Sequence, residues 1–159
     1  MAEPWSDEHP AGLRRVTKVL AYVVDGGRLL VFTQPEAPEA GLQVPAGTVE
    51  EGEALEAAVL RELAEESGLL NVSAPRYLGR RSVDMRALGK QEVHLRHFFA
   101  LRLLEAASAR WRHWERHSSD EQGPIAYDLH WHDLATGLPE LAAEQGALLE
   151  ALLPFKAPD

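Results

Sequence analysis

A single stretch, residues 44–69, combines the spacing of an amphipathic helix with a dense set of glutamates. From about Ala54 to Ser67 the apolar residues recur at helical intervals, and Gly68 follows as a residue typical of a helix C-terminus. At about 100° per residue, one apolar stripe should face the rest of the protein, and it contains Leu55, Ala58, Val59 and Leu63. The stretch therefore predicts a helix that packs one face against an apolar layer.

Three carboxylates, Glu62, Glu65 and Glu66, fall on or beside the same stripe. Residues at i, i+3 and i+4 are neighbours on a helix, where like charges repel, and burial against protein adds a desolvation penalty. A hard divalent cation would relieve both, because Mg²⁺ and Mn²⁺ prefer oxygen ligands and commonly bridge carboxylates to substrate phosphates. The alternative is a solvated helix face, which is the usual location of charged residues.

Strand-like segments surround this helix. Residues 15–25 and 28–34 are separated by Gly26-Gly27, which predicts a hairpin, and a short strand from Gly41 is expected to end at Pro45. Further strands are expected over residues 75–85, 92–104 and 125–134, a surface loop or short helix over 106–124, and an amphipathic helix over 138–153. Strands interspersed with two helices predict an α/β fold, with a mixed sheet covered by helices on its faces.

The length and composition favour a single domain over residues 1–159, with an irregular N-terminal segment over 1–13. The formal net charge of −9 argues against general nucleic-acid binding, which relies on clustered lysine and arginine. The absence of cysteine excludes disulfides and thiolate metal sites. No apolar run of membrane-spanning length and no signal-peptide pattern is present, so a cytoplasmic protein without membrane contact is expected.

The fixed positions of the glutamate-rich stretch follow one pattern: Gly47, five residues, Glu53, seven residues, Arg61-Glu62-Leu63, one residue, Glu65-Glu66, one residue and Gly68-Leu69. This pattern resembles the Nudix box without a departure. The resemblance implies an α/β/α Nudix sandwich with a mixed sheet. It also implies a MutT-like pyrophosphohydrolase that uses Mg²⁺ or Mn²⁺ to cleave a diphosphate linkage in a nucleotide or nucleoside diphosphate derivative.

The resemblance also implies residue roles. Glu62, Glu65 and Glu66 are expected to ligate the metal, Glu65 and Glu66 being central to catalysis, and a backbone carbonyl of Ala46 or Gly47 is expected to assist. Arg61 is expected to pair with Glu53, which would orient the helix and keep the guanidinium from neutralising the metal carboxylates; the alternative is an ordinary surface ion pair. Many relatives resemble "PGG" where this chain has Pro45-Ala46-Gly47, a difference that affects fine loop geometry.

A general base is expected outside the box. In MutT-like pyrophosphatases a glutamate in the loop before the last strand has this role, and here Glu121, beside Asp120, is the candidate. The alternatives for the general base are Glu92 and the glutamates of the box.

The segment "RWRHWERH", residues 110–117, is the most unusual one outside the box. On a helical turn Trp111 and Trp114 would share a face, where indole rings can stack on a base and Arg112 can contact a phosphate. These three residues are therefore candidates for substrate binding. The alternative is that the tryptophans anchor a long loop to the sheet, because aromatic residues dominate core burial.

Two functions of different class remain open: a metal-dependent hydrolase, and a non-catalytic nucleotide-binding or regulatory Nudix module that keeps the fold. Degenerate modules often lose box carboxylates, and here all of them are present, which favours the hydrolase. The histidines, such as His94 and His97 on opposite faces of one expected strand, do not form a zinc-site pattern. A homodimer is possible because many relatives of this family dimerise.

Overall fold

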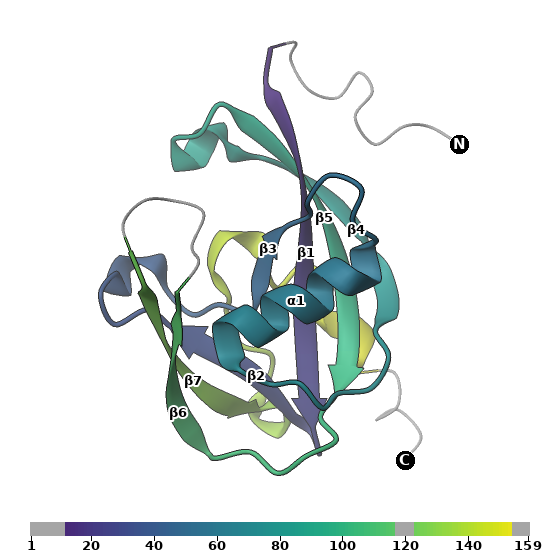
Figure 1. Cartoon of the computed structure of the whole chain (residues 1–159), viewed down its shortest axis with the longest axis vertical. Helices are drawn as coiled ribbons and strands as arrows, with labels where there is room; N and C mark the ends of the chain where they lie inside the picture. The colour runs from purple at the N-terminus through teal and green to yellow at the C-terminus, as the bar shows by residue number, and fades with distance from the viewer. Residues whose placement is uncertain (1–11, 117–122, 154–159) are drawn as a thin grey trace.

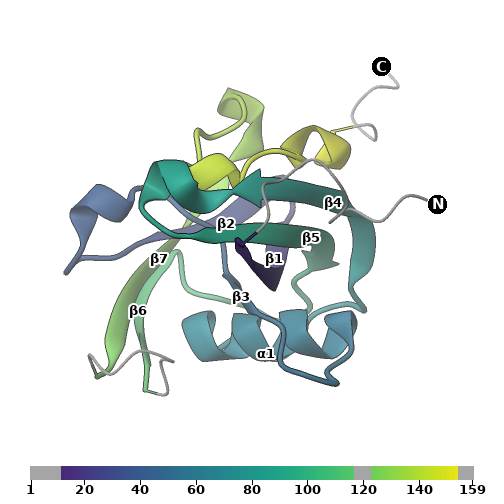
Figure 2. The same cartoon turned by 90° about the horizontal axis from the view of Figure 1, so that it is seen from above.

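The computed structural model describes residues 12–116 and 123–153. A central sheet lies between a single α-helix on one face and short 3-10 turns of the C-terminal segment on the other (Figures 1 and 2). The seven strands are β1 (Arg14–Asp25), β2 (Arg28–Thr33), β3 (Ala46–Thr48), β4 (Arg76–Asp84), β5 (Glu92–Arg102), β6 (Arg110–Glu115) and β7 (Ile125–Asp133). The α/β fold with a mixed sheet is confirmed.

The strand order is β4-β5-β1-β2-β7-β6, with β3 paired to β1 outside this path. β1 and β5 run parallel over eleven residue pairs, from Arg14 opposite Glu92 to Val24 opposite Arg102, and the other pairings are antiparallel. The expected hairpin joins β1 to β2. Its two glycines, Gly26 and Gly27, have φ values of 57° and 88°, as a tight two-residue hairpin turn requires.

Helix α1 (Leu55–Ser67) has nearly the expected bounds, and Gly68 ends it in the left-handed conformation with φ 81°. Its residues Ala58, Val59 and Leu63 are buried against the sheet, in a core that also includes Val19 and Leu101. A second core on the opposite face packs the sheet against the C-terminal segment. The strand β1 contributes alternate side chains to both cores, which is why its sequence is continuously apolar or aromatic from Val19 to Val24.

The expected helix over residues 138–153 is wrong. The segment forms only two short 3-10 turns, η4 (Ala142–Glu144) and η5 (Leu149–Leu152). Ala143 and Glu144 have positive φ values of 54° and 63°, which breaks helical geometry. Tertiary hydrogen bonds hold this irregular backbone: the Arg96 guanidinium donates to the Ala143 carbonyl, and the Tyr22 hydroxyl donates to the Gln145 carbonyl at 2.6 Å.

Two further expectations are corrected. Residues 110–115 form strand β6, paired with β7 from Arg110 opposite His130 to Glu115 opposite Ile125, rather than a loop or short helix. The short strand expected before Pro45 is reduced to a single bridge between Gln43 and Phe32, and β3 begins after the proline.

The remaining turns are η1 (Pro38–Ala40), η2 (Met85–Leu88) and η3 (Leu134–Thr136). Over the described parts of the chain, no helix combines the length and apolar character that crossing a membrane requires.

Candidate metal centre and active site

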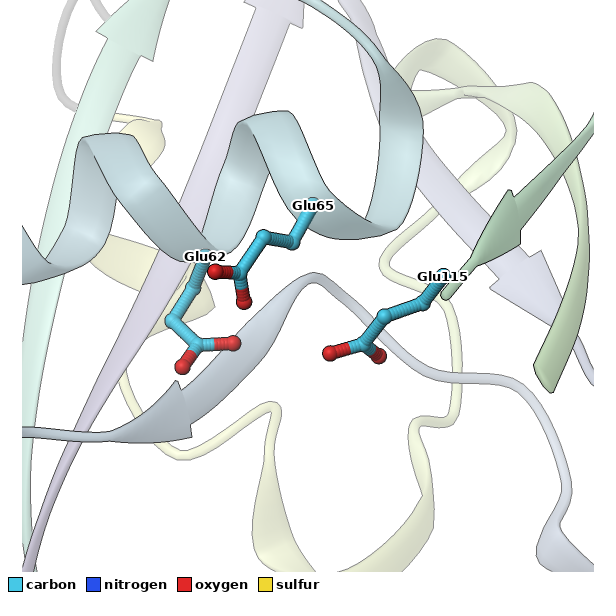
Figure 3. A group of neighbouring side chains, drawn as sticks. All are labelled: Glu62, Glu65 and Glu115. Carbon is cyan, nitrogen blue, oxygen red and sulfur yellow. The ribbon is translucent and has the colours of Figure 1, made fainter. Parts of the chain in front are cut away.

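Three carboxylates meet beside the C-terminal half of α1. Glu62 and Glu65 project from the helix and Glu115 comes from the end of β6, with their side chains directed toward one another (Figure 3). One oxygen from each of these glutamates, here called the carboxylate cluster, lies within 4.8 Å of the others. Within residues 12–116 and 123–153 this is the one group of three or more acidic or histidine side chains with such spacing. The expected contributions of Glu62 and Glu65 are thus brought together, and no histidine takes part.

The cluster opens onto a cavity of about 580 Å³, here called the carboxylate cavity. Five glutamates line it, and so do the backbone of β3 at Ala46 and Gly47 and three cations, Arg14, Lys18 and Arg61. The electrostatic repulsion between the carboxylates is what a bound cation would relieve.

Glu66 lies beside the cluster and is oriented differently. One of its carboxylate oxygens accepts a hydrogen bond from the Ala46 amide at 3.0 Å, and the residue is buried. Burial raises the pKa of Glu66 well above its usual value, opposed by the Ala46 hydrogen bond and reinforced by Glu62 and Glu115. The sequence pointed to a carbonyl at Ala46 or Gly47; the observed contact of Ala46 is through its amide. Glu66 therefore connects α1 to β3 beside the carboxylate cluster.

The expected pair between Arg61 and Glu53 is formed. Arg61 Nε donates to Glu53 Oε2 at 2.8 Å and Nη2 donates to Glu53 Oε1 at 2.9 Å. This bidentate hydrogen bonding lowers the pKa of Glu53 to about 2. Arg61 Nη2 also donates to the Thr48 carbonyl at 3.0 Å, so the pair connects the helix to the strand that faces it.

The expectation that Glu53 keeps Arg61 away from the metal carboxylates is wrong. Arg61 Nη1 lies 2.9 Å from Glu62 Oε2 and 3.4 Å from Glu65 Oε1. A guanidinium presents donors on several sides, so it can hold Glu53 with one edge and contact the cluster with another. Arg61 therefore offsets part of the negative charge of the cluster.

Glu115 is the residue that sequence reasoning missed. It lies on β6, in a segment for which a loop or helix was expected, and its position opposite α1 depends on the pairing of β6 with β7. The hydroxyl of the buried Tyr127 on β7 donates to Glu115 Oε1 at 2.7 Å and so fixes this carboxylate. The sequence signal was weak, because polar and apolar residues do not alternate strictly over residues 110–115; the period of a strand is seen only in the exposure of the side chains in the structure.

Two residues outside the box, Glu121 and Glu92, are candidates for the general base. Glu121 lies outside the described residues. Glu92 lies on β5, where His94 Nε2 is 2.8 Å from Glu92 Oε1 and Arg14 is 3.3 Å from the other oxygen, and Glu92 does not line the carboxylate cavity.

Trp111 and Trp114 do not share a face, because β6 is a strand and alternate residues point to opposite sides. Trp111 packs against the core under α1, and its Nε1 donates to the Ser67 carbonyl at 2.9 Å. Trp114 is 41% exposed. Arg112 forms two hydrogen bonds to Asp128 at 2.7 and 3.0 Å. Trp111 thus has the position expected if the tryptophans anchor this segment to the core. Substrate binding by Trp111, Trp114 and Arg112 stays a prediction.

The burial of Glu62 makes stability depend on pH when metal is absent. Burial raises the pKa of Glu62 from its usual 4.5 to about 7, so the folded state binds the proton more tightly than the unfolded state does. The tighter proton binding adds roughly 3 kcal/mol to the free energy of unfolding. This stabilisation is fully present below about pH 4.5 and is lost as the pH rises through about 7. In EDTA, we therefore expect the melting temperature to fall between pH 5 and pH 8, and Mg²⁺ or Mn²⁺ to restore it at pH 8.

The Glu62→Gln variant is the control for this prediction, because a glutamine does not titrate. Its melting temperature in EDTA should fall less than that of the wild type over the same pH range. Part of the fall should remain, because the pKa of Glu66 is also raised. An identical pH dependence in the two proteins would contradict the assignment of Glu62.

The family model and the solved structures that resemble this chain indicate the same family. Residues 14–152 match the NUDIX domain. Similar solved structures include a MutT Nudix hydrolase from Burkholderia pseudomallei (24% identity, 86% of this chain and 97% of that one, TM-score 0.62). A MutT protein from Methanosarcina mazei Go1 is 17% identical (93% and 99% covered, TM-score 0.63), and an ADP-ribose pyrophosphatase from Streptococcus suis 89-1591 is 22% identical (86% and 91% covered, TM-score 0.54).

A comparison with curated proteins found no significant match. The domain match covers both faces of the sheet, the box helix α1 and the strands that carry the carboxylate cluster. The chain therefore belongs to the Nudix family of hydrolases.

Proposed function

We propose that this Nudix hydrolase is a divalent-metal-dependent pyrophosphohydrolase that cleaves a diphosphate linkage in a nucleotide or nucleoside diphosphate derivative. The observation that carries the proposal is the carboxylate cluster of Glu62, Glu65 and Glu115 at the wall of an open cavity. Family membership supports the reaction class. The similar Streptococcus suis protein, an ADP-ribose pyrophosphatase, supports a nucleotide-type substrate.

The residues present fit a hard divalent cation. All donors of the cluster are carboxylate oxygens, which Mg²⁺ and Mn²⁺ prefer, and their crowding is unfavourable without a positive charge. Glu62, Glu65 and Glu115 would hold the ion, with Glu66 and the backbone at Ala46 and Gly47 beside them. The bound ion would neutralise the charge of the diphosphate, polarise phosphorus and lower the pKa of water.

The protein's own residues position the reacting groups. Tyr127 and the Ala46 amide fix the orientation of Glu115 and Glu66, while Arg61 holds Glu62. Pre-oriented charges of this kind need no rearrangement during the reaction, and such preorganisation is a large term in enzyme catalysis. The box glutamates are the alternative acceptors of the proton from the attacking water. Glu121 remains our candidate for the base outside the box.

The test is a substrate panel of nucleoside di- and triphosphates, nucleotide sugars, dinucleotides and capped RNA. Each compound is incubated with the protein in Mg²⁺, in Mn²⁺ and in EDTA, and products are followed by ³¹P NMR and chromatography. The proposal expects cleavage of at least one diphosphate linkage that stops in EDTA and resumes when metal is restored. Cleavage that persists unchanged in EDTA would contradict it.

The non-catalytic alternative makes the opposite prediction for the same panel. A binding or regulatory module would bind a panel compound in the presence of metal and release it intact. The complete set of box carboxylates favours the hydrolase, because a ligand sensor has no need for a partly buried, mutually repelling set of acids.

A further inference from the structure

A second cavity adjoins the carboxylate cavity on the other side of β3. It has a volume of about 250 Å³, and its lining includes four basic side chains: Lys18, Lys90, His94 and Arg96. No aspartate or glutamate appears among the described residues that line this cationic pocket, although the chain has a formal net charge of −9. The two cavities share Lys18, Ala46 and Gly47. An acidic site and a basic site thus meet at one short strand.

The floor of the cationic pocket is made of buried polar side chains. His94 and Arg96 on β5 are 3% and 5% exposed, and Gln145 from the C-terminal segment is 9% exposed. The Gln145 side-chain carbonyl accepts a hydrogen bond from the Val44 amide at 2.8 Å, which joins that segment to the residues before β3. Polar groups are buried here with defined partners, as in a formed binding site rather than a surface depression.

The wall opposite β5 has a backbone conformation that is rare for residues other than glycine. Ala143, which lines the pocket, and Glu144 both have positive φ, and the Arg96 guanidinium donates to the Ala143 carbonyl. Arg96 Nη2 also lies 3.8 Å from Met85 Sδ at the η2 turn. Such backbone conformations persist only where the surroundings enforce them, and they concentrate at functional sites. Arg96 therefore joins η2 and the C-terminal segment into one wall.

Lys18 has a positive charge that the described residues do not pair. Its Nζ donates to Thr48 Oγ1 at 2.8 Å, and no described carboxylate lies within ion-pair distance of it. Burial, and next the positive charge of Lys90, lower the pKa of Lys18, against the weaker opposite effect of Glu62 and Glu92. Two ammonium groups that repel each other and line the same polar pocket are a suitable site for an anion.

We propose that the cationic pocket binds a phosphate group of the substrate that lies beyond the diphosphate cleaved at the carboxylate cluster. The inference rests on the proposed function, because it assigns the pocket to the same substrate. With the diphosphate held at the carboxylate cluster, the next anionic group would extend past Gly47, which lines both cavities, toward Lys18 and Lys90. The extra phosphate has two possible sources: a longer polyphosphate chain, or a phosphate on the group joined to the nucleotide.

The test compares matched substrates in wild-type and variant proteins. The pairs are ATP with ADP, and ADP-ribose with the same compound carrying a phosphate on its terminal ribose. Lys90→Gln and Lys18→Gln should lower kcat/KM for the member with the extra phosphate by about 10- to 100-fold, the effect of one charge-assisted hydrogen bond. For the member that lacks it, Lys90→Gln should change kcat/KM by less than about threefold. The pair that responds identifies the source of the phosphate.

The matched control is Arg86→Gln. It removes the same charge from the η2 turn near Lys90, but Arg86 is exposed, pairs with Asp84 at 2.7 Å and does not line the pocket. Its kcat/KM should match the wild type for all four compounds. Equal losses for both members of each pair in Lys90→Gln would overturn the proposal, since Lys90 lines only the cationic pocket and such losses would indicate a general effect of charge.

A binding measurement without metal separates this inference from the proposed function. Inorganic phosphate is titrated into the protein in EDTA and followed by NMR, and Lys18→Gln or Lys90→Gln should raise its Kd about tenfold or more, whereas Arg86→Gln should not. If this holds while no panel compound is cleaved, the pocket assignment stands and the proposed reaction fails. If compounds are cleaved but phosphate binds all variants equally, the pocket assignment is overturned.

Discussion

Replacement of Glu65 by glutamine is expected to lower kcat/KM by about 10³-fold, the upper range for loss of one preorganised electrostatic group. Glu65 contributes an oxygen to the carboxylate cluster, and an amide is a much weaker ligand for a hard cation. The side chain of Glu65 is 31% exposed and its contact with Arg61 is long, at 3.4 Å. The substitution should therefore change the melting temperature by no more than about 2 °C.

The measurements are steady-state kinetics with the best compound of the panel and Mn²⁺ binding followed by electron paramagnetic resonance. The control is Glu56→Gln, an exposed glutamate in the first turn of the same helix, which changes the charge equally and should retain wild-type turnover. A Glu65→Gln protein with near-normal turnover and unchanged Mn²⁺ affinity would remove this residue from the metal centre.

The box helix and its site could be predicted from sequence because the necessary information is local. The apolar spacing from Leu55 to Leu63 determines which face of α1 is buried, and Gly68 determines where the helix ends. Once that face is known, the positions of Glu62 and Glu66 on its edge follow from helical geometry, and both are buried as the spacing implies. Arg61 and Glu53 meet because Glu53 lies just before the N-terminus of α1 and Arg61 lies in its second turn.

The contribution of Glu115 depends on non-local pairing and was missed for that reason. Its segment, "RWRHWE", has charged residues at positions 110, 112 and 115 and tryptophans at 111 and 114, a pattern that fits an edge strand, a loop or a helical turn. Pairing with β7 decides between them and brings Glu115 to Tyr127 and to the far side of the cavity. A sequence motif confined to residues 47–69 contains no information on that partner.

The C-terminal segment shows the opposite error, in which a good local pattern is overruled by tertiary contacts. Residues 138–153 have helical apolar spacing, but Gly146 weakens the helix and the segment instead follows the surface of the second core. Leu141, Leu149 and Leu152 are buried there without an α-helix. The irregular backbone that results places Ala143 and Gln145 at the cationic pocket, where a regular helix would present side chains with different geometry.

Replacement of Gly47 by alanine is expected to disable the metal centre without unfolding the protein. A Cβ atom at Gly47 would lie 1.9 Å from Glu62 Cδ and 2.1 and 2.2 Å from its two carboxylate oxygens, distances that real atoms do not adopt. The obstructed atoms are the end of a flexible side chain, so the Glu62 carboxylate moves away rather than the backbone. We expect Mn²⁺ affinity to fall about 10- to 100-fold and turnover by at least as much.

The matched control is Gly146→Ala, at a second glycine without a positive φ among the described residues, where the nearest atom to a new Cβ is Leu149 Cδ1 at 3.2 Å. That variant adds the same methyl group next to an apolar side chain, so it can change the melting temperature but should leave Mn²⁺ affinity unchanged. Gly47→Ala should show the reverse: a melting temperature in EDTA at pH 8 close to or above the wild-type value, because displacement of Glu62 relieves repulsion within the cluster. Wild-type Mn²⁺ affinity in Gly47→Ala would contradict the geometry, since it would require that the Glu62 carboxylate keep its place beside β3 with the methyl group present.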